Sequence, residues 1–518
     1  ITASAGTSNF RAGVNAGNSI ESGGNYNVVV GDEAGTAITT SDNNVAVGYS
    51  AGKAVTTGHS NVLLGSLAGD ALNEGTDNVV LGFGSLGSDT KGNKSTALGR
   101  GTLVGQNFTS ATDTYNTAVG YFAGNAVTTG VSNTLIGGLA GDALTTGSSN
   151  VAVGYGALTT DDVGQWNVAI GRDALSAQNI VSAANTYNTA VGGSAGAAIT
   201  TGYNNTLIGG LAGDAITTGA NSTAVGYAAL GATTTGWSNV AVGYQALTAN
   251  TTGENNVAVG REALATNTTG GSNVALGRNA LDANTTAANN TAVGMSALTA
   301  NTTGTSNVAV GSLALDANTT ASNNTAVGHD ALTANTTGTG NSSLGAYSLP
   351  ACTTGDYNVA IGYQSQRLTT TADNNTGLGA YTLYDNTTGA SNTAVGFSAL
   401  ANNTTGTQNT AVGESALLAN TIGANNTAIG REALKANTEG SFNVAMGRTS
   451  LTTNTTGSNN VALGYQALNA STTADANTAL GHNSLSASTT GSGNTAVGSL
   501  SGDAITTGVN NTTVGRAS

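Results

Sequence analysis

The sequence predicts an all-β protein, a parallel β-solenoid or β-roll in which each 17-residue repeat forms one coil. A glycine that closes a short apolar run recurs at every seventeenth position from Gly31 to Gly515, and only two of the gaps are longer, each by four positions. Such a fixed period is typical of stacked repeats. The run between each asparagine and that glycine, as in 256–260 (Asn-Val-Ala-Val-Gly), is rich in β-branched residues and indicates a short strand. Glycine and asparagine interrupt every repeat, which disfavours helices.

Repeat positions are numbered here from the asparagine, so that Asn256 is position 1, Gly260 position 5 and Gly270 position 15. We expect residues 27–518 to form one continuous array and residues 1–26 to form a degenerate N-terminal coil or cap. A repeat array grows by adding neighbours, so the length of 518 residues does not require several globular domains.

Position 1 predicts a ladder of side chains along the array. It is asparagine in 27 of the 29 repeats, and the exceptions are Ser95 and Ser222. Stacked strands lie about 4.8 Å apart, so equal positions of successive coils become neighbours. We expect each of these asparagines to adopt a left-handed turn and to bond through its amide to the coils on either side.

The second half of the repeat is long enough for another short strand, and it carries the large aliphatic residues. Most coils have leucine at position 9 and asparagine at position 12, as at Leu264 and Asn267. A second coil type has glycine at 9 and an aliphatic residue at 12, as at Gly213 and Ile216. This exchange predicts that both positions are interior and that the chain bends between them. We expect Leu264 to face the core together with Val259.

Two four-residue insertions interrupt the register, near residues 104–115 and 176–187. They contain Gln106–Ala111 and Gln178–Ala183, and the separation between them equals four coils plus one insertion, so a four-coil block is duplicated. Both insertions should project from the same side. They are either inherited bulges or binding loops, since insertions in repeat proteins often form the binding face.

The composition argues against several classes of function. A net charge of −14 with only 13 lysines and arginines leaves no basic face for nucleic acid. No apolar run approaches the roughly 20 residues of a membrane span, so we expect no membrane insertion. The three histidines lie many coils apart and no catalytic constellation is visible. We therefore expect no enzyme activity, no catalytic residues, no cofactor and no metal site.

The core of one chain is thin, which favours self-association. Two large aliphatic side chains per coil contribute roughly 3–6 kcal/mol when buried, against roughly 17–34 kcal/mol of backbone entropy for the residues of one repeat. Positions 3 and 5, alanine and glycine, lie on the strand face opposite Val259 and suggest a surface that another backbone approaches closely. We expect a homo-oligomer.

Position 6, directly after the strand glycine, is the most patterned variable position. We assign candidate glycan or receptor contacts to its tyrosines: Tyr49, Tyr121, Tyr155, Tyr227, Tyr244, Tyr363 and Tyr465, beside Phe83 and Phe397. We assign candidate contacts between coils or subunits to its arginines: Arg100, Arg172, Arg261, Arg278, Arg431 and Arg448, with Arg516 at the same position. A tyrosine ring offers an apolar face and a polar tip, which suits stacking on sugars.

The repeated run Asn-Thr/Val-Ala-Val/Ile-Gly resembles the head repeat of trimeric autotransporter adhesins. The 17-residue form, with Ala-Leu and Asn-Thr-Thr-Gly further on, is similar to arrays in phage tail fibres and bacterial surface proteins. The resemblance covers about residues 27–518. It implies left-handed parallel β-rolls packed as a trimeric fibre. No coiled-coil stalk, membrane anchor or self-cleaving chaperone domain is visible in this sequence, unlike in those proteins.

The sequence therefore favours a structural and adhesive fibre, the shaft and receptor-contacting surface of a phage tail fibre or bacterial surface adhesin. Its location would be extracellular, on a virion or on the bacterial surface, and its receptor a cell-surface polysaccharide or protein. The alternative is a subunit that polymerises end to end into an extracellular filament or matrix. A minor alternative, an ice-binding solenoid, rests on the threonines at positions 13 and 14, although adjacent residues should leave only one outward row.

Overall fold

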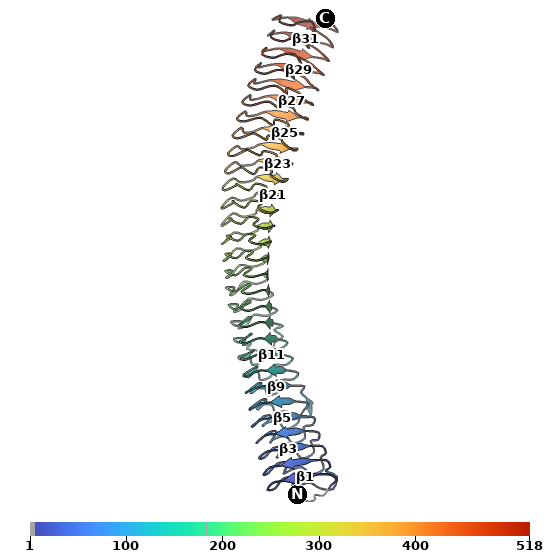
Figure 1. Cartoon of the computed structure of the whole chain (residues 1–518), viewed down its shortest axis with the longest axis vertical. Coiled ribbons are helices and arrows are strands. Elements are labelled where there is room, and N and C mark those ends of the chain that lie inside the picture. Colours follow the sequence, from blue (N-terminus) through green and yellow to red (C-terminus); the bar gives the residue numbers. More distant parts are fainter. Residues whose placement is uncertain (1–5, 183) are drawn as a thin grey trace. The chain divides into compact units, whose positions relative to one another are not determined.

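The computed structural model describes residues 6–182 and 184–518, so that the first five residues of the expected cap lie outside it. The chain divides into two units, Ile1–Arg261 and Glu262–Ser518. Each is a parallel β-solenoid, and the described residues form about 30 coils with a spacing of about 17 residues. Figure 1 shows short strands lying side by side within each unit, one to a coil.

Nearly all strands are three residues long and occupy positions 2–4 of the repeat. The first unit contains β1 (Phe10–Ala12), β2 (Val28–Val30), β3 (Val45–Val47), β4 (Val62–Leu64), β5 (Val79–Leu81), β6 (Gly92–Asn93), β7 (Thr96–Leu98), β8 (Thr112–Asp113), β9 (Thr117–Val119), β10 (Thr134–Ile136), β11 (Val151–Val153), β12 (Val168–Ile170), β13 (Thr189–Val191), β14 (Thr206–Ile208), β15 (Thr223–Val225), β16 (Val240–Val242) and β17 (Val257–Val259).

The strands of the second unit follow the same spacing without interruption. They are β18 (Val274–Leu276), β19 (Thr291–Val293), β20 (Val308–Val310), β21 (Thr325–Val327), β22 (Ser342–Leu344), β23 (Val359–Ile361), β24 (Thr376–Leu378), β25 (Thr393–Val395), β26 (Thr410–Val412), β27 (Thr427–Ile429), β28 (Val444–Met446), β29 (Val461–Leu463), β30 (Thr478–Leu480), β31 (Thr495–Val497) and β32 (Thr512–Val514).

Successive coil strands pair in parallel with equal positions opposite one another. Val444 of β28 lies opposite Val461 of β29, for example. The expected second strand does not form, because the segment after position 5 consists of turns. Positions 7 and 9 adopt left-handed backbone, with φ of 56° at Glu432 and 52° at Leu434. Residues with positive φ cannot continue an extended strand.

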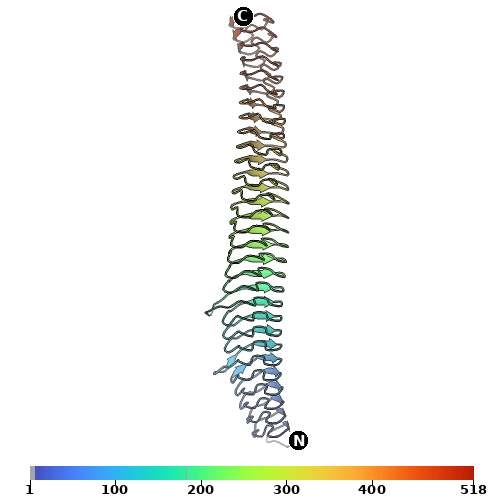
Figure 2. The ribbon, with the colours of Figure 1, turned by 90° about the vertical axis from the view of Figure 1, so that its left-hand side faces the viewer.

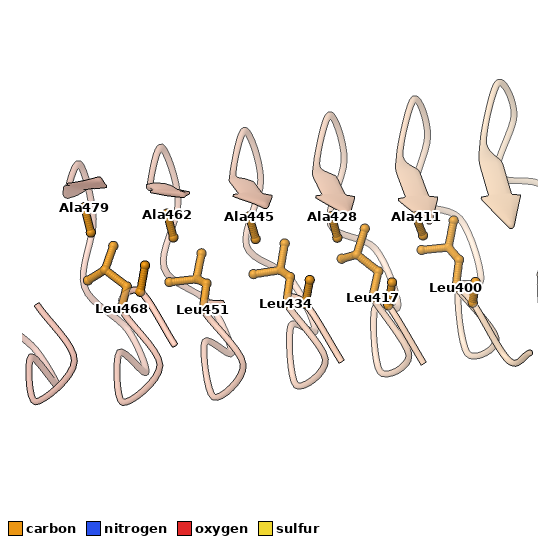
Figure 3. Packing of buried hydrophobic residues seen from close by; sticks show 14 of the residues in the cluster. Leu400, Ala411, Leu417, Ala428, Leu434, Ala445, Leu451, Ala462, Leu468 and Ala479 are labelled. Atoms are coloured by element: carbon orange, nitrogen blue, oxygen red, sulfur yellow. The ribbon is translucent and has the colours of Figure 1, made fainter. Parts of the chain in front are cut away.

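The core is built from position 3 of the strand and positions 8 and 9 of the turn. Figure 3 shows leucines such as Leu417 and Leu434 pointing toward the strand alanines, such as Ala428, and both kinds are fully buried. The predicted burial of Leu264 is confirmed, because its exposed fraction is 0%. The predicted burial of Val259 is wrong: this side chain is 37% exposed, whereas Ala258 is 0% exposed.

The strand therefore has the opposite orientation from the predicted one: its position 3 side chain faces the core and its position 4 side chain faces outward. The reason is steric. In most coils the position 9 leucine fills the space under the strand and position 3 is the small alanine, although the coil with Leu86 at position 9 also buries Val80 at position 3. The small residue at position 5 has a structural explanation within the solenoid. A Cβ at Gly243 would lie 2.5 Å from the carbonyl oxygen of Gly260, which belongs to the next coil of the same unit. The close backbone approach predicted from small residues is thus between coils.

The two coil types share the left-handed backbone at position 9 and differ in which positions supply the core side chains. In the common type Leu247 is buried with φ of 52°. In the second type Gly213 has φ of 56°, and the buried aliphatic groups come from Ile216 and from Leu207 at position 3 of the strand. The predicted interior character of both positions, and the bend between them, are confirmed. Glycine removes the steric cost of left-handed backbone at position 9, and an aliphatic residue at position 12 restores the lost volume.

The predicted asparagine ladder forms at position 1. The side-chain oxygen of Asn239 accepts the backbone N–H of Asn256 at 3.0 Å, and its side-chain nitrogen donates to the carbonyl of Gly253 at 2.9 Å. The left-handed residue is at position 17 instead of position 1, as at Asn255 with φ of 58°. Position 1 is the first residue before the strand, so its backbone already takes part in the bonding between coils.

Both insertions are in the first unit and project from the same side, as Figure 2 shows. The first adds a short pairing of β6 with β8, in which Asn93 lies opposite Asp113. The second has a bridge between Gln165 and Asn185 at the equivalent place of the duplicated block. Residue 183 of the second insertion lies outside the described residues. The duplicated block predicted from the sequence therefore has a matching backbone in both copies.

Candidate functional site

The position 6 side chains leave the coil directly after the strand and point to solvent. The preceding glycine has a positive φ, 136° at Gly226, so that the chain turns sharply there. The candidate tyrosines are all exposed: Tyr49, Tyr121, Tyr155, Tyr227, Tyr244, Tyr363 and Tyr465. Phe83 and Phe397 are exposed at the same position. We call this surface the position 6 row.

Tyr227 and Tyr244 form the most regular part of the position 6 row in the first unit. Their rings stack with centroids 5.7 Å apart and an angle of 16° between the planes. The guanidinium carbon of Arg261 lies 5.9 Å from the centroid of Tyr244, over the ring. Stacked rings with a cation at one end make a flat surface with polar edges, which suits a ligand that has apolar faces and hydroxyl groups.

The second unit contains a similar arrangement on three successive coils. The rings of Tyr465 and His482 stack at 5.4 Å with an angle of 20°. The guanidinium carbon of Arg448 lies 6.0 Å from the Tyr465 centroid. Arginine, tyrosine and a further ring thus recur as a group within the position 6 row of each unit.

Other arginines of the position 6 row make contacts of different kinds. Arg100 lies over the ring of Phe83 in the preceding coil at 5.7 Å, beside a hollow of about 110 Å³ lined also by Phe122. Arg431 pairs with Glu414 of the preceding coil at 3.4 Å. Arg172 pairs with its own neighbour Asp173 at 3.2 Å. Arg278 and Arg516 are exposed.

A longer run of rings in the second unit was not predicted from the sequence. His329, Tyr347, Tyr363, Tyr381 and Phe397 follow one another with centroid distances of 5.4 to 6.3 Å, each contact edge to face. Tyr347 and Tyr381 are at position 7, where the neighbouring position 6 is alanine. The alternation of rings between positions 6 and 7 is the sequence signal that could have revealed this run.

The two insertions are held by buried polar networks at position 12. The side-chain nitrogen of Gln178 donates to Asp161 at 2.7 Å, and the side-chain nitrogen of Asn188 donates to the oxygen of Gln178 at 2.9 Å. Gly164 donates its backbone N–H to Asp161 at 3.1 Å. Burial raises the pKa of Asp161, although these hydrogen bonds lower it in part. The first insertion has the same network, with Gln106 donating to Asp89 at 2.7 Å.

The threonine rows do not present two outward rows of hydroxyls. In the second unit the position 13 hydroxyls donate to the next coil, as Thr285 does to the carbonyl of Thr302 at 3.2 Å. The position 14 threonines, such as Thr286, are exposed. One regular outward row is a weaker basis for ice binding than the two rows of a flat array.

The remaining polar and reactive groups give little indication of chemistry. Across residues 6–182 and 184–518 no three or more His, Cys, Asp or Glu side chains gather as a metal site. The same part of the chain has no helix with the length and apolar character of a membrane span. Cys352 is fully buried at position 12, and burial raises the pKa of its thiol to about 11.

Comparison of the chain with protein-family models and with curated proteins found no match.

Proposed function

We propose that the chain is a structural and adhesive protein without catalytic activity, the shaft and receptor-contacting surface of an extracellular fibre. A phage tail fibre or a bacterial surface adhesin is the parent that the repeat resemblance favours. In this proposal the coils are left-handed and three chains pack into one fibre. The cell-surface receptor is a polysaccharide or a protein.

The observation that carries the proposal is the apolar outer face of the sheet. Position 4 holds a valine, leucine, isoleucine or methionine, and it points away from the core in coil after coil. The exposed large side chains at this position include Leu81, Ile136, Ile170, Ile208 and Val259 in the first unit, and Leu276, Leu344, Leu378, Met446 and Leu480 in the second. Soluble monomers rarely expose a contiguous apolar patch of this extent.

A second and third copy of the chain are the proposed occupants of this face. Its valines, leucines and threonines carry few charges, so an equally apolar face covers them best. A three-residue strand in every coil gives each chain the same flat surface, and three such surfaces close around one axis. Association also supplies the apolar burial that one thin core lacks.

The receptor-contacting surface is proposed to be the position 6 row, two residues beyond the associating position. Its tyrosine and phenylalanine rings and its arginines are exposed on the single chain, and the residue type varies while the backbone does not. A surface of this kind can differ between related fibres without changing the fold.

Light scattering combined with size-exclusion chromatography tests the association. The wild-type chain should have a fixed mass of three chains, and Leu344→Lys combined with Leu378→Lys should reduce it to one. Thr354→Lys with Thr388→Lys is the matched control, because it adds the same charges at the exposed position 14 of the same two coils. That control should keep the trimer.

Two results would contradict the proposal. A wild-type monomer at micromolar concentration would remove the proposed role of the apolar face. A mass that rises continuously with concentration would instead favour the end-to-end filament or matrix subunit. Electron micrographs provide a second measurement, because a closed trimer has one length and a polymer has many.

A further inference from the structure

The two insertions are copies of one framework with different side chains at their exposed tips. In both, a buried aspartate and glutamine fix the loop, and a short parallel bridge brings together the side chains that occupy position 17 in adjacent coils. These residues are Lys94 and Tyr115 in the first copy, and Trp166 and Tyr187 in the second. All four have left-handed backbone, with φ between 49° and 62°.

The tip of the first copy satisfies its own polar groups. The ammonium group of Lys94 bonds to Asp113 at 2.6 Å and to the hydroxyl of Tyr115 at 3.3 Å. It also lies 5.2 Å from the Tyr115 centroid, over the ring. Because 57% of the Tyr115 side chain is exposed, the first tip differs from the second in its charges and its single ring and not in its exposure.

The tip of the second copy replaces the ion pair with rings and an amide. Trp166 occupies the position in the second copy that Lys94 occupies in the first, and Asn185 likewise corresponds to Asp113. The rings of Trp166 and Tyr187 stack at 6.5 Å with an angle of 25°, and about half of each side chain is exposed. The side-chain nitrogen of Asn185 donates to the hydroxyl of Tyr187 at 2.9 Å, which fixes the polar edge of the pair.

The residues next to this pair at position 17 have smaller side chains. Position 17 holds Ser149 in the coil before and Asn204 in the coil after, and both are small compared with an indole. Below the tip the backbone is tied to the position 1 ladder, since the N–H of Asn188 donates to the side-chain oxygen of Asn167 at 3.1 Å. A platform fixed in this way loses little conformational entropy when it binds a ligand.

We propose that Trp166, Tyr187 and Asn185 form a subsite for a neutral saccharide. This inference rests on the adhesive part of the proposed function and names its ligand class at the second insertion. The apolar C–H face of a sugar ring packs on the indole or the phenol ring. The amide of Asn185 and the hydroxyl of Tyr187 supply donors and acceptors for the sugar hydroxyls.

The tip of the second copy carries no charged side chain at the three proposed positions, so it should bind neutral sugars in preference to charged ones. No lysine or arginine stands at the three proposed positions to pair with a carboxylate or sulfate, whereas the first copy carries a lysine there. Binding should therefore depend weakly on ionic strength, because screening acts on charges.

The test is binding of the full chain to an array of immobilised neutral, acidic and amino oligosaccharides. Trp166→Ala with Tyr187→Ala should weaken binding to the neutral members about ten-fold or more, where a factor of ten corresponds to about 1.4 kcal/mol. The matched control is Lys94→Ala with Tyr115→Ala at the first copy, which should leave that binding unchanged. Circular dichroism of each variant checks that the β-solenoid is retained.

Two further variants make the test sharper. Trp237 is the other tryptophan of the chain, so Trp237→Phe leaves Trp166 as the sole indole fluorophore. Its emission should shift when a neutral oligosaccharide selected on the array is added. Lys94→Trp with Asp113→Asn gives the first copy the tip residues of the second, and this variant should bind more neutral oligosaccharide per chain than the wild type.

The outcomes separate this inference from the proposed function. If the wild type binds neutral oligosaccharides and the Trp166 and Tyr187 variant binds them equally well, the inference is wrong while the adhesive proposal stands. Binding to acidic members alone would also overturn the inference. If the wild type binds no member of the array, this subsite is rejected, and the mass measurement still tests the fibre independently.

Discussion

The side-chain oxygen of Asn443 accepts two hydrogen bonds from Asn460 of the next coil, one from the backbone N–H at 3.0 Å and one from the side-chain amide at 3.1 Å. The nitrogen of Asn443 donates to the carbonyl of Gly457 at 2.9 Å. Both asparagines are fully buried. A single amide thus joins two coils and closes its own turn.

Asn443→Asp should destabilise this part of the second unit strongly. The substitution removes the donor to Gly457 and places a carboxylate against that carbonyl, and an unsatisfied buried polar group costs roughly 1–3 kcal/mol. Hydrogen exchange should show lost protection in the coils around residue 443. Asn443→Ser is the matched control, because the hydroxyl of Ser222 accepts the N–H of Asn239 at 3.3 Å. Serine keeps an acceptor for the next coil without adding a charge, so it should cost less than aspartate. Equal losses for the two variants would contradict the repulsion by the carboxylate, and wild-type protection in Asn443→Asp would contradict the role of the amide.

The two coil types predict a pair of compensating substitutions. Leu434→Gly should destabilise its coil, since loss of a buried leucine side chain typically costs about 2–5 kcal/mol. Adding Asn437→Val should recover part of this loss, because position 12 then supplies the core side chain as in the second type. Limited proteolysis near residues 430–440 provides the measurement. A double variant more sensitive than Leu434→Gly alone would show that the types cannot be exchanged coil by coil.

The position 6 row predicts a loss of attachment without loss of fold. Tyr227→Ala with Tyr244→Ala should weaken attachment to cells or polysaccharide, and each stacking surface contributes roughly 1 kcal/mol by analogy with aromatic pairs. Thr235→Ala with Thr252→Ala, at the exposed position 14 of the same coils, is the matched control. Full attachment of the tyrosine variant would assign recognition to another part of the protein.

Because of Asp161, we expect the local stability of the second insertion to depend on pH. Burial raises the pKa of Asp161 above its ordinary value of 3.8, so folding favours the neutral form. The resulting stabilisation is complete below about pH 3.8 and is lost as the pH rises through the raised pKa. Hydrogen exchange corrected for intrinsic rates should show more protection around residue 178 near pH 4 than near pH 7. Asp161→Asn should abolish this difference, and a persistent difference would assign it to another group.

We expect the thiol of Cys352 to react slowly with alkylating reagents in the folded chain. Burial raises its pKa to about 11, so little thiolate forms at neutral pH, and the side chain is inaccessible. A maleimide reagent at pH 7.5 should label the folded chain far more slowly than the chain in denaturant. Rapid labelling of the folded chain would mean that this coil opens readily.

The sequence was sufficient for the period, the parallel register, the asparagine ladder and the burial of Leu264. It did not decide which face of the strand is inward. A three-residue strand such as Val257–Val259 offers two large side chains on one face and one small one on the other. Judged by side-chain volume alone, Val259 was expected to face the core, because it is larger than Ala258. The deciding factor was the left-handed backbone of Leu264, which directs a large side chain into the core under the strands, and leucine rarely adopts that backbone.

The candidate surfaces could be predicted only where equal positions carry the same kind of residue. Tyr227 and Tyr244 share position 6 in adjacent coils, so their stacking follows from the period. Tyr347 and Tyr381 lie one position further on and were missed. The insertion separates Trp166 from Tyr187 by more than one repeat, so the regular period does not bring these two residues into register.

The asparagine ladders give each unit a direction. In the first unit the oxygen of Asn239 accepts from Asn256, and in the second the oxygen of Asn443 accepts from Asn460 at 3.0 Å. In both cases the earlier coil supplies the acceptor and the later coil the donor. During synthesis, which runs from the N-terminus, a finished coil therefore offers its acceptors to the segment made next. The nascent chain can thus fold by templated addition, one repeat at a time, without waiting for distant sequence.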